Sequence, residues 1–250
     1  MSPSDPYLLV DREPALLPGS FRGYESPAPG GPAQRRVTGG HYKWLGAVKI
    51  AISGTHSTGK TTTLRCACDR LRSAGLSVDI VPEMSSHCPL PIARAQTIES
   101  TLWIVLSMIR CEIERSAICD VLLVDRPVAD AFAYLVAAQA ARDAQPERPS
   151  PTYRSLVALI RHWSPTYRCV FRTCALPGLR IEDDGRRDLD ENFRASVEAI
   201  MPRVDRRLGQ HVLPLAGNVD ADADAIAAAA AAAARQMLCP APPRRPRTTG

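Results

Sequence analysis

The chain of 250 residues is 45% hydrophobic and 23% charged, which suits one folded domain with additional segments at its ends. Of its net charge of +5, residues 1–46 carry +1 and residues 239–250 carry +3, so residues 47–238 carry only +1. A nucleic-acid-binding face needs concentrated positive charge, so this distribution argues against nucleic acid as a partner.

The two ends differ in composition from the centre. Residues 1–46 contain seven prolines and seven glycines without an apolar period, and residues 239–250 are basic and rich in proline, so both are expected to be disordered tails. Residues 47–238 are expected to form a single domain. The N-terminal run YLLV is shorter than a signal peptide requires, and no apolar run reaches the ~18 residues of a membrane span. We therefore expect a soluble, cytoplasmic protein, and the sequence leaves its oligomeric state open.

The eight cysteines include no C-x-x-C pair, which argues against a zinc site. Cys111, Cys119 and Cys169 stand in apolar, periodic stretches, which is typical of buried thiols. Reduced, buried thiols agree with a cytoplasmic compartment.

The predicted elements alternate between strand and helix. The apolar run at residues 47–53 predicts a strand, the stretch GTHSTGKTT follows it, and a helix continues to about Ser73. This alternation predicts an α/β fold of three layers, with helices on both faces of a five-stranded, mainly parallel sheet. Further strands are predicted at residues 76–82, 120–125, 166–174 and 211–216, and further helices at about residues 94–119, 128–144, 153–163, 193–204 and 220–238.

The helix predicted at residues 94–119 has apolar residues at intervals of three and four, which indicates one buried face. Trp103 and Met108 broaden this stripe and are expected in the core. The expected members of the buried face are Ala95, Ile98, Leu102, Leu106, Ile109 and Ile113.

The stretch GTHSTGKTT, residues 54–62, satisfies the pattern G-x-x-x-x-G-K-[ST] between a predicted strand and a predicted helix. Glycines let backbone N–H groups approach phosphate oxygens, and the helix N-terminus adds partial positive charge. Lys60 is expected to reach the β- and γ-phosphates and Thr61 to ligate Mg²⁺. A glycine turn without a ligand is the alternative. The expected ligand is ATP, with GTP possible, held by Gly54, Thr55, His56, Ser57, Thr58, Gly59, Lys60, Thr61 and Thr62.

Acidic and basic residues lie at the end of the third predicted strand and just after it. Asp125 ends the apolar run DVLLVD, where an acid can hold Mg²⁺ through water or be a plain strand-end carboxylate. Arg126 can contact a substrate phosphate or pair with a neighbouring acid. Asp130 and Tyr134 lie one helical turn apart, so both can point to one substrate site, or they are ordinary surface residues.

Glu83 follows the second predicted strand, and ligands of open parallel sheets bind at the carboxyl ends of the strands. We therefore expect Glu83 beside the phosphate loop, where it can accept a proton from a substrate hydroxyl or hold a ribose hydroxyl. The later stretch RIEDDGRRD offers Arg180, Arg186 and Arg187, whose charge can stabilise a transferring phosphoryl group. For both features, a solvated loop is the alternative.

Several of these stretches together resemble a known family. GTHSTGKTT, VPE, DRPVADAFAY and DDGRRD, with FRASVEAI behind it, are similar to the P-loop domain that NadR-type nicotinamide riboside kinases share with TRPL-translocation-defect proteins. A more distant resemblance is to deoxynucleoside kinases. The resemblance covers residues 50–205 and implies a five-stranded kinase-like sheet, Glu83 as base or hydroxyl anchor, Asp125 near magnesium and Arg187 on a lid. Pro127 departs from the serine or threonine common in nucleoside kinases, which removes a hydroxyl contact to substrate.

These features favour an Mg²⁺- and ATP-dependent phosphotransferase that acts on a hydroxyl of a small, nucleoside-like acceptor. Lys60, Glu83, Asp125 and Arg187 are the expected catalytic residues. A regulatory module that binds ATP or GTP is the first alternative, although the sequence lacks the guanine-reading N/T-K-x-D pattern. A polynucleotide 5′-kinase is another alternative, which the nearly neutral central part disfavours.

Overall fold

A five-stranded parallel sheet forms the centre of the computed structural model, which describes residues 46–55, 58–142, 150–173 and 191–238. Every neighbouring pair of strands is parallel. The expected α/β fold with five strands is therefore confirmed. In the spatial order β2-β3-β1-β4-β5, the strands are β1 (Val48–Ser53), β2 (Val78–Val81), β3 (Val121–Asp125), β4 (Cys169–Arg172) and β5 (Val212–Pro214).

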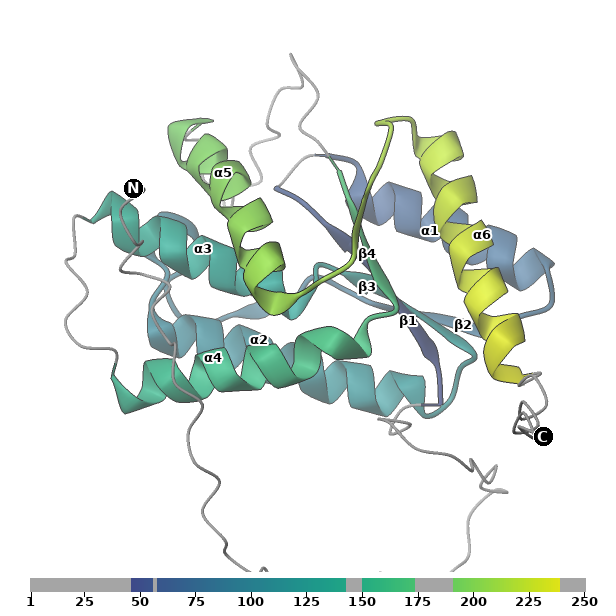
Figure 1. Cartoon of the computed structure of the whole chain (residues 1–250), viewed down its shortest axis with the longest axis horizontal. Helices are drawn as coiled ribbons and strands as arrows, with labels where there is room; N and C mark the ends of the chain where they lie inside the picture. The colour runs from purple at the N-terminus through teal and green to yellow at the C-terminus, as the bar shows by residue number, and fades with distance from the viewer. Residues whose placement is uncertain (1–45, 56–57, 143–149, 174–190, 239–250) are drawn as a thin grey trace, which may run out of the picture. The chain divides into compact units, whose positions relative to one another are not determined.

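Helices cover both faces of the sheet (Figure 1). Helices α1 and α6 pack together on one face, whereas α2, α3, α4 and α5 lie on the other. Within the described ranges, no helix is long and apolar enough to cross a lipid bilayer. The helices are α1 (Lys60–Ser73), α2 (Ile98–Ser116), α3 (Val128–Ala141), α4 (Pro151–Trp163), α5 (Glu191–Leu208) and α6 (Val219–Leu238), with short 3₁₀ turns η2 (Ser85–His87), η3 (Ala93–Ala95) and η4 (Ser164–Thr166).

The two central strands bring the chemically important loops to one edge of the sheet. Every residue of β1 and β3 is buried, as expected for parallel strands covered on both faces. The register pairs Ile52 with Asp125, so the loop after β1 begins beside the acid that ends β3. This edge is where open parallel sheets bind their ligands.

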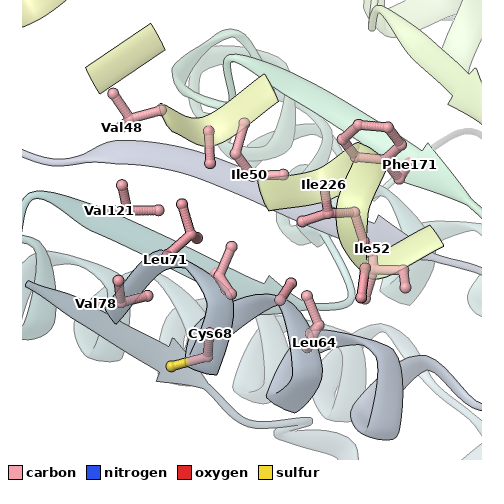
Figure 2. Packing of buried hydrophobic residues seen from close by; sticks show 14 of the residues in the cluster. Val48, Ile50, Ile52, Leu64, Cys68, Leu71, Val78, Val121, Phe171 and Ile226 are labelled. Atoms are coloured by element: carbon pink, nitrogen blue, oxygen red, sulfur yellow. The ribbon is translucent and has the colours of Figure 1, made fainter. Parts of the chain in front are cut away.

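An apolar core between the sheet and helices α1 and α6 anchors the start of α1 (Figure 2). Ile50, Ile52, Leu64 and Ile226 are fully buried there. Burial of each such side chain contributes about 1.5–3 kcal/mol. The buried alanines of α6 let that helix approach α1 closely, so a sequence of low complexity becomes part of the core.

Helix α2 begins later and ends earlier than the predicted residues 94–119. Thr97 is its N-cap: the Thr97 hydroxyl accepts from the backbone N–H of Ser100 at 3.2 Å, and the Ser100 hydroxyl accepts from the N–H of Thr97 at 2.8 Å. This reciprocal capping sets the start of the helix. Ala93 has φ 56°, a left-handed conformation, so the preceding residues form a separate turn. Strand β4 is likewise shorter than the predicted residues 166–174: residue 166 belongs to η4, residues 167–168 form a bend, and the strand ends at Arg172.

The predicted buried face of α2 is wrong. Leu106 and Ile113 are 50% and 47% exposed, and of the predicted stripe only Ile109 is buried. The buried face carries Ile104, Val105, Met108, Cys111 and also polar residues such as Glu112. Apolar periodicity treats Glu112 as a solvent position, so the predicted stripe is rotated around the helix relative to the buried face, and the two share Met108 and Ile109. Cys111 and Cys169 are buried as predicted, whereas Cys119 is half-buried.

Candidate active site

The phosphate loop connects β1 to α1 with a backbone that requires glycine. Gly54 has φ 140°, and a Cβ there would lie 2.2 Å from Oγ1 of Thr173. Gly59 has φ 76° and directly precedes α1. L-residues rarely adopt such φ values, so the backbone conformation of the loop requires glycine at both positions.

Lys60 folds back over this loop. Its Nζ donates to the backbone carbonyl of Thr55 and to Oγ1 of Thr58, the latter at 3.2 Å. Burial, followed by the charge of Arg126, lowers the pKa of Lys60 to about 7, although Asp125 acts in the opposite direction. Among the described residues, the hydrogen-bond partners of this buried ammonium are a carbonyl and a hydroxyl, an environment that a bound phosphate would complete.

Thr61 and Asp125 lie together at the start of α1 and the end of β3. The Thr61 hydroxyl donates to Oδ2 of Asp125 at 2.6 Å. The other carboxylate oxygen, Oδ1, is buried and has no hydrogen-bond partner among the described residues. Mg²⁺ prefers oxygen ligands, so a buried carboxylate oxygen without a partner beside a hydroxyl fits this ion.

A cavity of about 250 Å³ opens next to these residues. Its wall combines apolar side chains with polar and charged groups, as in pockets for small molecules. Both non-glycine residues of the described chain with positive φ, Ala93 and Arg126, are part of the wall, and such strain gathers at functional sites. The lining residues are Glu83, Met84, Ser85, Ser86, Ile92, Ala93, Gln96, Ile104, Met108, Asp125, Arg126, Pro127, Asp130, Ala131 and Tyr134.

Arg126 connects the phosphate loop with this cavity. Its Nη1 donates to the carbonyl of Gly54 at 2.7 Å, and its Nε lies 2.9 Å from Oε1 of Glu83. Burial alone would lower the pKa of Arg126, but the surrounding negative groups, Glu83 first, raise it above its ordinary value. Arg126 was expected either to contact a substrate phosphate or to pair with a neighbouring acid, and in the structure it pairs with Glu83.

Glu83 stands at the cavity wall directly after β2. Its Oε1 accepts from the Ser85 hydroxyl at 2.6 Å as well as facing Arg126. The side chain keeps 33% of its surface exposed, so it is oriented by these two partners and is still accessible to a ligand. Glu83 therefore lies near the phosphate loop, as expected, because Arg126 contacts both Glu83 and the Gly54 carbonyl of the loop.

Asp130 and Tyr134 are buried, so the surface alternative for these two residues is wrong. Asp130 accepts from the Ser53 hydroxyl at 2.6 Å and from the backbone N–H of Gly54 at 3.1 Å. Burial raises the pKa of Asp130, and burial raises that of Tyr134 to about 12. Asp130 thus supports the first turn of the phosphate loop, while Tyr134 packs behind Arg126, whose Nη1 lies 3.5 Å from its hydroxyl.

Gln96 is a polar residue of the cavity that the sequence reading missed. Its Nε2 donates to the Ala131 carbonyl at 2.8 Å and to Oγ1 of Thr101 at 2.9 Å. Thr101 uses its own hydroxyl hydrogen for the carbonyl of Thr97, so both partners of Nε2 are acceptors and the orientation of the amide is determined. A single glutamine before a helix cap carries no pattern, so only the tertiary contacts identify it.

A second missed group lies below the loop, on β4 and α5. Arg172 Nη2 donates to Oγ of Ser53 at 3.0 Å and to Oδ2 of Asp205 at 2.7 Å. Burial raises the pKa of Asp205 to about 6, although Arg172 acts to lower it. This network ties α5 to the last residue of β1.

The remaining predicted site residues lie outside the described part of the chain. They are His56 and Ser57 of the phosphate loop and the arginines Arg180, Arg186 and Arg187. Thr62, the last residue of the motif, is exposed in the first turn of α1.

The parallel sheet, the glycine loop between β1 and α1 and the acid at the end of β3 together define a P-loop α/β domain. The profile of a family described as AAA domain, AAA_28, matches residues 49–221, and the chain belongs to this family. The expected resemblance to this group of P-loop proteins is thereby confirmed.

Solved structures confirm the fold. A crystal structure of the NadR protein in complex with NR has 14% sequence identity and a TM-score of 0.53, over 80% of this chain and 53% of that chain. This chain therefore spans about half the length of that protein. The deoxyadenosine kinase of M. mycoides with the products dCMP and dCDP has 12% identity and a TM-score of 0.51, over 72% of this chain and 96% of that chain. No curated protein sequence matches the chain.

Proposed function

We propose that this protein is an ATP- and Mg²⁺-dependent phosphotransferase that acts on a hydroxyl of a small, nucleoside-like acceptor. The observation that carries the proposal is the Glu83–Arg126 ion pair in the wall of a cavity that also includes Asp125, next to the phosphate loop. A nucleotide switch needs no oriented carboxylate beside an acceptor-sized cavity. The kinases of similar fold agree with this function without naming the acceptor.

The donor half consists of the phosphate loop and α1. The loop backbone and Thr58 cradle the phosphates, and Lys60 exchanges its contact with the Thr55 carbonyl for the β- and γ-phosphates. Thr61 and Asp125 hold Mg²⁺, which neutralises charge on the β- and γ-phosphate oxygens when it is bound. GTP could take the place of ATP at the same residues, because these residues are proposed to contact the phosphates and Mg²⁺ and not the nucleotide base.

The acceptor half consists of Glu83 and the cavity. Glu83 accepts the proton of the acceptor hydroxyl while the hydroxyl oxygen forms its bond to the γ-phosphorus and the bond to the β–γ bridging oxygen breaks. Arg126 orients the Glu83 carboxylate, since its Nε lies 2.9 Å from Oε1 of Glu83. Arg187, with Arg180 and Arg186, supplies positive charge over the transferring group.

Gln96 gives the acceptor cavity a chemical preference. Both hydrogens of its amide are used by Thr101 and Ala131, so its carbonyl oxygen Oε1 is the atom that can bond a ligand. That oxygen can only accept hydrogen bonds, so the favoured substrate carries an N–H donor, such as an amino group or carboxamide on its ring. A substrate with a keto group in that place would instead bring two hydrogen-bond acceptors, its own oxygen and Oε1 of Gln96, against each other.

The test is ADP release from ATP and Mg²⁺ in the presence of a panel of nucleosides and ribosides. At least one acceptor is expected to raise the rate well above that without acceptor, and Lys60→Met is expected to abolish the increase. If no acceptor raises the rate, the kinase proposal fails. Slow turnover with tightly retained nucleotide, independent of any acceptor, would then support the regulatory module.

A further inference from the structure

Helix α5 places an acid directly on the phosphate loop. The hydroxyl of Thr55 donates to Oε1 of Glu198 at 2.6 Å. Thr55 is 1% exposed, and it is the second residue of the loop, so this contact lies where phosphate is expected to bind. A carboxylate in this position has the same sign of charge as a triphosphate and opposes its binding.

The same carboxylate oxygen faces an arginine. Nε of Arg194 lies 3.6 Å from Oε1 of Glu198, one helical turn away on α5. The Arg194 side chain is only 15% exposed, whereas Glu198 is 37% exposed, so the guanidinium is on the inner side of the pair. Among the described residues, Glu198 is the one acid within salt-bridge distance of Arg194. One carboxylate oxygen therefore joins the loop hydroxyl to the guanidinium.

An ordinary surface pair does not have this geometry. Arg110 and Glu114 on α2 have the same spacing of four residues, at 3.1 Å, but their side chains are 72% and 57% exposed and touch no loop. Such exposed pairs contribute little to stability. The Arg194–Glu198 pair is longer, more buried and in contact with Thr55, which points to a role in the phosphate site.

We propose that Arg194 is a phosphate-binding arginine that Glu198 holds in reserve until a nucleoside triphosphate enters the loop. The arriving phosphates displace Glu198 from Thr55, and Arg194 exchanges its contact with Glu198 for an oxygen of the terminal phosphate. Planar guanidinium groups make strong, charge-assisted contacts to phosphate, so this exchange favours the triphosphate over the diphosphate. This inference rests on the proposed binding of ATP but not on any acceptor.

The experiment measures dissociation constants of ATP and ADP with Mg²⁺ and without acceptor, by calorimetry, for the full chain. Arg194→Gln is expected to weaken ATP binding about tenfold while ADP binding changes little. Glu198→Gln, which keeps the shape and removes the charge, is expected to tighten ATP binding about threefold or more. Arg194→Lys is expected to retain part of the preference for ATP. Arg110→Gln and Glu114→Gln are the matched controls and leave both constants unchanged.

Thermal unfolding of each variant separates loss of folding from loss of binding. Equal weakening of ATP and ADP by Arg194→Gln, or weaker ATP binding in Glu198→Gln, overturns the proposal. A wild-type chain that binds neither ATP nor ADP overturns it as well. A chain that shows the expected ATP preference but phosphorylates no acceptor contradicts the proposed function alone, so the two failures are distinguishable.

Discussion

Two buried ionic clusters lie near the two ends of β1, and they differ in whether their groups have partners. Near the start of the strand, Lys49 donates to Glu112 at 2.9 Å and to Thr166 at 2.5 Å, and lies 4.3 Å from the centroid of the Trp163 ring. Glu112 also accepts from Nε1 of Trp163 and from the Tyr167 hydroxyl. Both charges are therefore fully paired, as buried charges must be to be tolerated.

The cluster beyond the other end of β1 is incomplete. Asp125 has an oxygen without a hydrogen-bond partner among the described residues, Arg126 has φ 79°, and a cavity opens beside both. Buried charged residues thus form a fully paired, closed cluster at one end of β1 and, at the other end, an open cluster in which the Oδ1 atom of Asp125 has no hydrogen-bond partner among the described residues. The difference teaches that unsatisfied groups and strain, rather than buried charge itself, distinguish a functional cluster.

The largest expected effect comes from breaking the closed cluster. Glu112→Ala leaves Lys49 buried without its counterion and is expected to lower the free energy of unfolding by about 3–5 kcal/mol. Chemical denaturation measures the loss, and Glu114→Ala, an exposed neighbour, is the control with an expected change within about 0.5 kcal/mol. A loss in Glu112→Ala no greater than in the control would contradict the structural role.

Breaking the open cluster is expected to affect turnover and to leave stability nearly intact. Glu83→Gln removes the proposed proton acceptor and is expected to lower kcat about a hundredfold or more, with little change in the dissociation constant of ATP. Steady-state kinetics with the acceptor found above, together with ATP titration, measures both. A variant that loses ATP affinity and keeps kcat would place Glu83 on the donor side instead.

Asp205, which pairs with Arg172 next to the last residue of β1, has a raised pKa. The pKa of Asp205 in the folded chain is about 6, above its ordinary 3.8, because burial outweighs the opposing charge of Arg172. Protonation therefore favours the folded state: this stabilisation is complete below about pH 4 and is lost as the pH rises through 6. Relative to Asp205→Asn, the wild type is expected to lose about 1–2 kcal/mol of unfolding free energy between pH 4 and pH 7. Parallel pH profiles of the two proteins would disprove the shift.

The smallest expected effect concerns the preference for the acceptor. With the Gln96 carbonyl as an acceptor only, ligands with a ring amino group or carboxamide are expected to have kcat/KM about tenfold above their keto or carboxylate counterparts. Cytidine against uridine, adenosine against inosine and nicotinamide riboside against nicotinic acid riboside are matched pairs for this measurement. Gln96→Leu is expected to remove the preference, and a preference that survives in this variant would assign it to another residue.

Local patterns in the sequence predicted most of the donor side. The glycine spacing, the strand before it and the helix after it define the phosphate loop by themselves, because each depends on residues within one short stretch. The placement of Glu83 and Asp125 at one edge followed from strand alternation, since parallel strands end on the same side.

The acceptor side and the contact from α5 could not be predicted in this way. Gln96 and Glu198 have no motif, and each has a decisive contact with a residue far along the chain: Gln96 with Ala131, 35 positions away, and Glu198 with Thr55, 143 positions away. The buried face of α2 was misplaced for the same reason, because the partners that allow Glu112 to be buried, Lys49, Trp163 and Tyr167, all lie outside this helix. Hydrophobic periodicity cannot anticipate a polar residue whose partner lies in another element.

The sequence by itself thus determined the class of fold, the phosphate loop and the placement of Glu83 and Asp125 at the same edge of the sheet, because these depend on local spacing and on the alternation of strands and helices. Tertiary structure decided which polar groups are satisfied, which are left open at Asp125 and which, like Glu198, reach across to the loop. The physical reason is that a hydrogen bond or ion pair between distant residues depends on packing in three dimensions, and no short stretch of sequence contains that information.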